Sequence, residues 1–256
     1  MRAFVAFFKK EITESVRSGK LLILTILFAA FGIMNPAIAK LTPYLMELLS
    51  EEMGEIGMTV TSVEVDALTS WTQFFKNIPM ALIAFVCIYG GIFAKEFESG
   101  TLVLMLTKGL ARYKVALAKS SLLLIMWSAG YWLCFGITYG YNAYFWDNGI
   151  ATGLMTAAFN WWLFGIFTVA LMSLFSVVAR GYSSVLLGTG AVVLASYLLG
   201  MIPKISKYLP TSLMNSAKLL VGTEDMGDYI YALAIAAALS VACIVASVPI
   251  FNKKQL

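Results

Sequence analysis

The sequence predicts an all-α integral membrane protein that crosses the bilayer six times. Of its 256 residues, 60% are hydrophobic and 12% are charged, whereas about 25% are charged in an ordinary soluble domain. This many apolar residues exceed what one core can bury, so the surplus must face lipid. Six apolar windows are also long enough for a spanning helix of about 20 residues, and charged or turn-rich segments separate them.

The chain begins with an expected amphipathic elbow helix over residues 1–19. Phe4, Phe8, Ile12 and Val16 recur every four residues, while charged residues occupy the other faces. A helix of this kind lies along the inner membrane interface. It either anchors the first span or also acts as a lever that contacts a cytoplasmic partner.

The whole chain, residues 1–256, is expected to form one transmembrane domain. The fourth apolar window is longer than one crossing requires, so it tilts, bends at Gly165 or extends beyond the bilayer. The expected spans are Leu21–Ala39, Ile78–Ala94, Ser120–Tyr141, Gly149–Ala179, Gly181–Ile202 and Tyr229–Phe251.

Two external segments are expected between these spans. Residues 40–77 contain an amphipathic helix that starts near Pro43, a residue suited to the first turn of a helix. Residues 203–228 include Leu209–Val221, an apolar stretch too short to cross the bilayer and close to two prolines. This stretch predicts a re-entrant hairpin before the last span, and neighbouring spans must protect its backbone from lipid.

The distribution of basic residues predicts the orientation. Six spans put both termini on one side, and 13 of the 18 Lys and Arg residues lie on that side. Positive residues mark the cytoplasmic side, so we expect a multi-pass protein of the inner cell membrane with both termini cytoplasmic. The basic residues on the opposite side are Lys40, Lys76, Lys204, Lys207 and Lys218.

The composition also excludes several classes of function. Histidine is absent, which removes Ser-His-Asp and Cys-His hydrolysis and histidine-ligated metals. The three cysteines show no ligand spacing. No carboxylate lies at the centre of a span, which argues against an ion-coupled carrier. We therefore expect no catalytic residue, metal site, resident cofactor or nucleic-acid partner for this chain.

The connection over residues 95–119 is the most informative segment. Ser99 is a suitable N-cap and Glu96 and Glu98 favour the positive end of a helix over Thr101–Thr107. One apolar face of this short helix cannot be buried within the loop and suits a groove on another protein. The alternative is a charged loop with a helix that dips into the membrane.

The pattern Glu-x-x-x-Gly-Thr-Leu, followed by Arg112 and Lys119, resembles the membrane subunits of type-2 ATP-binding-cassette exporters. The size and layout are similar to small bacterial permeases that export peptides, including antimicrobial-peptide immunity systems and the phenol-soluble modulin exporter. The resemblance implies that Thr101–Thr107 is a coupling helix that docks in an ATPase. The implied ATPase-coupling residues are Glu96, Glu98, Gly100, Thr101, Leu102, Met105, Leu106 and Arg112.

ATP hydrolysis is not expected in this chain. It contains no Gly-x-x-x-x-Gly-Lys-[Ser/Thr] loop, and the nearest fragment, Ser18-Gly19-Lys20-Leu21, lacks the first glycine and the terminal hydroxyl. We expect ATP and Mg to bind in a P-loop ATPase present in two copies. The resemblance also implies a second permease copy or a paralogue.

Aromatic residues crowd the outer half of the third and fourth spans. They belong to the interfacial belt and the packing, or they line a path for a hydrophobic or amphipathic substrate. We expect export of such a substrate, most consistent with a peptide. The alternative is a membrane-embedded immunity or scaffold protein that binds peptide without transport. The candidate path residues are Tyr131, Trp132, Tyr139, Trp161 and Trp162.

Overall fold

The computed structural model describes residues 2–54, 65–94, 96, 100, 107, 111–179 and 181–253. These residues form helices and turns, with no strand among them. In this part of the chain, six helices are long and apolar enough to cross a membrane, which confirms the predicted fold class. The candidate spans are Lys20–Glu47, Ala67–Tyr89, Arg112–Phe145, Leu154–Val178, Tyr182–Leu199 and Met226–Lys253.

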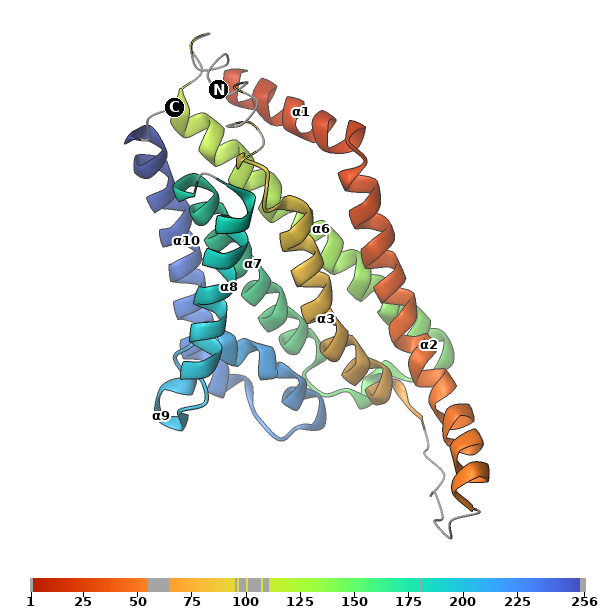
Figure 1. Cartoon of the computed structure of the whole chain (residues 1–256). Helices are drawn as coiled ribbons and strands as arrows, with labels where there is room; N and C mark the ends of the chain where they lie inside the picture. Colours follow the sequence, from red (N-terminus) through yellow and green to blue (C-terminus); the bar gives the residue numbers. More distant parts are fainter. Residues whose placement is uncertain are drawn as a thin grey trace.

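The amino-terminal helices form an angled pair (Figure 1). Two residues, Ser18 and Gly19, separate helix α1 (Arg2–Arg17) from helix α2 (Lys20–Gly54). Gly19 stands between them with a φ of 73°, in the left-handed region that glycine adopts without the penalty of a Cβ. The change of direction therefore has a local cause, while the position of α1 at the membrane interface stays a prediction.

Helix α2 differs from the prediction because it continues without a break beyond the expected end of the first span at Ala39. The expected external helix near Pro43 is the last part of this same helix. Pro36 and Pro43 both lie inside it. An internal proline removes one backbone hydrogen bond and bends a helix, but it does not force the helix to end.

Helix α3 (Ala67–Tyr89) begins well before the expected start at Ile78. The side chain of Asp66 accepts a hydrogen bond from the backbone N–H of Thr69 at 2.9 Å and caps the helix there. The predicted boundary is wrong because the first turns of α3 are polar, so hydropathy placed Lys76 outside the span. In the structure Lys76 lies within the helix and the candidate span, while the predicted external position of residues 67–77 stays a prediction.

The remaining elements surround a central helix, α7 (Leu154–Val178). Helices α6 (Arg112–Phe145), α8 (Tyr182–Leu199) and α10 (Ile230–Lys253) pack against it, as Figure 1 shows. The most apolar window of α7 is 67% buried, compared with 17% for α8. The core therefore centres on α7, and most of α8 remains open to lipid or to another chain.

The possible bend at Gly165 is not needed, because α7 is one continuous helix. Gly165 instead accommodates the indole ring of Trp127 from α6. A Cβ at position 165 would lie 2.1 Å from ring atoms of Trp127, which is fully buried. The ring also donates a hydrogen bond to the carbonyl of Trp162 at 3.2 Å. Gly165 thus permits the close approach of α6 and α7.

The segment between α8 and α10 contains α9 (Pro203–Ser206) and the 3-10 helices η2 (Pro210–Val221) and η3 (Met226–Tyr229). Side chains around α7 protect the carbonyls of η2. Trp161 donates to the Met214 carbonyl at 3.0 Å, and Thr152 donates to the Leu219 carbonyl at 3.1 Å. These are the contacts that a re-entrant hairpin requires, and its depth in the membrane stays a prediction.

The contact at Gly165 gives a stability prediction. Gly165→Ala should lower the free energy of unfolding by about 1–3 kcal/mol, because the new methyl group overpacks the interface with Trp127. Denaturant-induced unfolding in detergent micelles measures the change. Gly136→Ala is the matched control, since a Cβ there meets no atom within 4 Å. Equal stability of the two variants would contradict the packing argument.

Candidate functional site

A buried cluster of charged residues joins α1, Glu96 and α6. Lys119 on α6 has a side chain only 1% exposed. Its Nζ atom lies 2.8 Å from Oε2 of Glu11 and 3.0 Å from Oε2 of Glu96, and it donates a hydrogen bond to the Ile92 carbonyl at 3.2 Å. The ammonium group therefore connects three separate parts of the chain.

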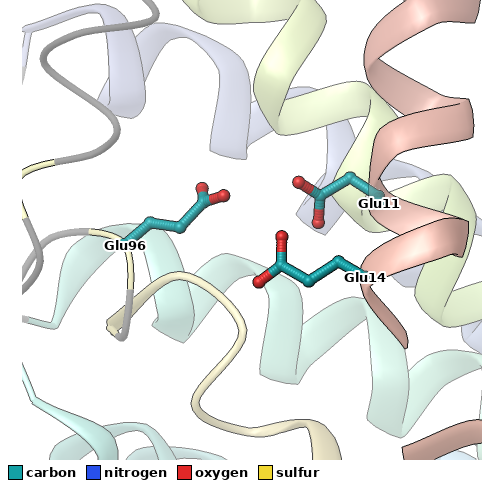
Figure 2. A group of neighbouring side chains, drawn as sticks. All are labelled: Glu11, Glu14 and Glu96. Atoms are coloured by element: carbon teal, nitrogen blue, oxygen red, sulfur yellow. The ribbon is translucent and has the colours of Figure 1, made fainter. Parts of the chain in front are cut away.

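Lys10 completes the cluster from its partly exposed edge. Its Nζ atom lies 2.7 Å from Glu14, 2.8 Å from Glu96 and 2.9 Å from Glu11. Figure 2 shows Glu11 and Glu14 reaching from α1 toward Glu96, which follows the end of α3. Glu11 and Glu96 thus each bridge the two lysines. We call Lys10, Glu11, Glu14, Glu96 and Lys119 the ion cluster.

Within the ion cluster, the contacts of Lys10 favour its charged form. Burial lowers the pKa of Lys10, but hydrogen bonds to Glu14, Glu96 and Glu11 outweigh burial, so the pKa of Lys10 lies above its usual value. A group with a raised pKa stabilises the fold below its unfolded-state pKa and loses this contribution as the pH rises further. The Lys10 contribution is therefore lost only in strongly alkaline solution.

The three glutamates also have the geometry of a cation site. One carboxylate oxygen from each of Glu11, Glu14 and Glu96 lies within 4.8 Å of the others. Lys10 contacts all three carboxylates, so its ammonium group supplies the positive charge that a metal ion would bring. The cluster is accordingly an arrangement of ion pairs, and no metal is needed to explain it.

The ion cluster depends on which face α1 turns toward the bundle. The buried row is Phe7, Glu11 and Ser15, four residues apart. The predicted apolar row is less buried, and its last member, Val16, is 53% exposed. Ser15 shares a hydrogen bond of 2.9 Å with the hydroxyl of Tyr89 on α3. The sequence analysis did not identify Glu11 as a site residue. Its position four residues from both Phe7 and Ser15, on one face of the helix, was a signal that it could face the bundle.

The structure describes three of the eight predicted ATPase-coupling residues. Glu96 belongs to the ion cluster, and Gly100 has a φ of 67°. Arg112 begins α6, and its guanidinium group donates to the Asn252 carbonyl at the end of α10 at 3.1 Å. The role of these residues in coupling stays a prediction. The other members, Glu98, Thr101, Leu102, Met105 and Leu106, lie outside the described residues.

The five candidate path residues do not form one surface. Tyr131 and Trp161 are fully buried and donate hydrogen bonds to backbone carbonyls, at 2.7 Å to Ala158 and 3.0 Å to Met214. In this conformation both rings are packed in the core. Trp162 is partly buried, and the exposed members are Trp132 and Tyr139 on α6. Their contact with a substrate stays a prediction.

Removing the buried ammonium group tests the ion cluster. Lys119→Met should lower the free energy of unfolding by about 3–5 kcal/mol, because it leaves Glu11 and Glu96 without their buried partner. Unfolding in detergent micelles measures the loss. Lys218→Met is the control, since Lys218 pairs with Glu224 at the surface and such pairs contribute about 0–1 kcal/mol.

A double-variant cycle separates the ion pair from general damage to α6. The loss in Glu11→Gln/Lys119→Met should be smaller than the sum of the two single losses, because the partners interact directly at 2.8 Å. Strictly additive losses would argue against the pair.

A match to a protein-family model covers almost the entire chain. The model of the family described as ABC-2 family transporter protein matches residues 5–254. This range includes most of α1, the whole ion cluster and all six candidate spans. A comparison with curated proteins found no match. Because the match extends over far more than half of the chain, the protein belongs to the ABC-2 family of transporter proteins.

Proposed function

We propose that this chain is the transmembrane subunit of an ATP-binding-cassette exporter and that separate ATPase subunits drive it. Family membership and the six candidate spans support the role of a membrane subunit. The sequence has no P-loop, so ATP and Mg would bind in the partner. The observation that carries the coupling mechanism is the ion pair between Glu96 and Lys119.

Glu96 stands five residues before Thr101, where the predicted coupling helix begins. It is ion-paired with Lys10 on α1 and Lys119 on α6. If an ATPase displaces this segment, α1 and α6 must move with Glu96, or buried ion pairs must break at a cost of several kcal/mol. The ion cluster thereby supports the transfer of movement from the ATPase to the spans.

Arg112 connects the other end of the predicted coupling segment to the helix bundle. It lies where the chain enters α6, and it contacts the end of α10 through the Asn252 carbonyl. The predicted coupling segment is therefore bordered by Glu96 on one side and Arg112 on the other. Movement between these points would reach α1, α6 and α10 together.

A second permease, either another copy or a paralogue, would enclose the path with this one. The exposed apolar surfaces of α8 and α10 support this assembly, since 17% and 22% of their most apolar windows are buried. We propose two ATPase subunits per complex. Both termini would be cytoplasmic, as the excess of Lys and Arg on that side indicates.

The proposed substrate is a hydrophobic or amphipathic molecule, most consistent with a peptide. The resemblance to small peptide-exporting permeases and the exposed aromatic residues Trp132 and Tyr139 of α6 support this choice. The alternative function is an immunity or scaffold protein that binds peptide in the membrane without transport.

The docking assignment predicts a specific loss of binding. Replacing Leu102, Met105 and Leu106 together with aspartate should abolish co-purification of the ATPase while membrane insertion is retained, because charge would replace the predicted apolar face. Ile150→Asp is the control: this residue is exposed in the short 3-10 helix η1 (Asn148–Ile150), at the outer end of the predicted fourth span. ATPase retained by the triple variant would refute the assignment.

Export and scaffolding give different results in reconstituted vesicles. With the partner ATPase present, an exporter should move a fluorescent amphipathic peptide across the bilayer only when ATP is hydrolysed. A scaffold should retain the peptide equally with ATP or with a non-hydrolysable analogue. Stopped flux in a variant whose ATPase lacks its P-loop lysine would confirm that the partner drives transport.

A further inference from the structure

A groove of about 340 Å³ with a mixed polar and apolar lining lies between α2 and α3. These helices run side by side (Figure 1). Thr69, Thr72, Gln73 and Lys76 line it from α3, at the spacing of one helical face, and Thr42 faces them from α2. Five polar side chains from two candidate spans therefore share one groove.

The groove lies in the half of the spans that is predicted to be external. Lys76 comes nine residues after Ala67, the first residue of α3, which is about 14 Å along the helix. Charged residues within spans are expensive and mark functional sites. In the described part of the chain, neither Lys76 nor Gln73 has a side-chain hydrogen bond or ion pair, so their donors are available to a ligand.

A chain of polar contacts lies close to the groove. The amide of Asn77 donates to the side-chain oxygen of Asn35 at 2.9 Å, and the amide of Asn35 donates to the hydroxyl of Thr138 at 3.3 Å. These bonds hold α2, α3 and α6 together next to Lys76. These hydrogen bonds therefore hold the two helices that form the groove in a fixed arrangement.

The threonine hydroxyls present acceptors to the groove. Thr42 and Thr72 donate their hydrogens to the backbone carbonyls of Ile38 and Leu68, each at 2.8 Å. Thr69 donates to the Asp66 carboxylate at 3.1 Å. Their oxygens keep free lone pairs, while Gln73 and Lys76 supply the donors. A complementary ligand has an anionic acceptor next to hydroxyl donors.

Apolar residues in the lining of the groove favour a ligand that also carries a hydrocarbon chain: Ile38 and Ala39 on α2, and Leu68 on α3. Met80 and Ile83, farther along α3, are exposed. We propose that the groove binds the headgroup of an anionic phospholipid of the phosphatidylglycerol type. Its phosphate accepts from Lys76 and Gln73, its glycerol hydroxyls donate to the threonine oxygens, and its acyl chains lie against the exposed faces of α2 and α3.

This lipid site is independent of the proposed transport function, so it can be tested on the purified chain without an ATPase. Native mass spectrometry from detergent micelles should detect phosphatidylglycerol bound more tightly than phosphatidylcholine. Lys76→Gln should weaken phosphatidylglycerol binding by about tenfold, which corresponds to the loss of one modest ion pair. Lys204→Gln on α9 removes the same charge from an exposed position outside the groove and should bind as the original chain does.

A second variant tests the hydroxyl contacts and does not depend on the lysine. Thr72→Val should reduce the preference for phosphatidylglycerol over phosphatidic acid, which lacks the headgroup glycerol. The proposal is overturned if Lys76→Gln, with an unchanged unfolding midpoint, binds as tightly as the original chain. It is also overturned if inorganic phosphate or glycerol 3-phosphate competes as well as the lipid, since the site would then serve a free anion.

Discussion

The ion pair between Lys119 and Glu11 is the constraint on which the end of the bundle that carries α1 depends. An ammonium group that is almost fully buried requires carboxylates at contact distance, because an unpaired charge in such a place costs several kcal/mol. Satisfying Lys119 fixes three parts of the chain at once: α1 through Glu11, the end of the α3 region through Glu96, and α6 itself. The start of the predicted coupling segment is held by the same contacts.

The bundle uses different interactions at different depths. Ion pairs join the elements at the end that carries α1. In the middle, small residues allow aromatic rings to pack closely: Gly165 accommodates Trp127, and Gly130 lies against the ring of Phe28. Toward the other end, polar contacts of Asn35 with Asn77 and Thr138 lie beside the α2–α3 groove. The proposed movement of the ATPase would therefore enter through the most strongly connected end.

Much of the fold could be predicted because the bilayer sets the length of a span whatever its neighbours are. The boundaries of the helices could not be predicted in this way. Helix α3 begins at Ala67 because Asp66 caps it, although its first turns contain Lys76 and read as a polar connection. Helix α2 continues past Ala39 because Pro36 and Pro43 are accommodated inside it. Hydropathy averages over such local features, whereas helix ends depend on single hydrogen bonds.

The sequence by itself determined the all-helical class and the six candidate spans, since these follow from composition and span length. Only the tertiary structure decided that Glu11 faces the bundle and meets Lys119, 108 positions away. Helical periodicity identifies the rows of α1, but it does not reveal which row packs inward when a buried charge on another helix outweighs apolar burial. That choice depends on where α6 places its lysine, and this is a property of the assembled bundle.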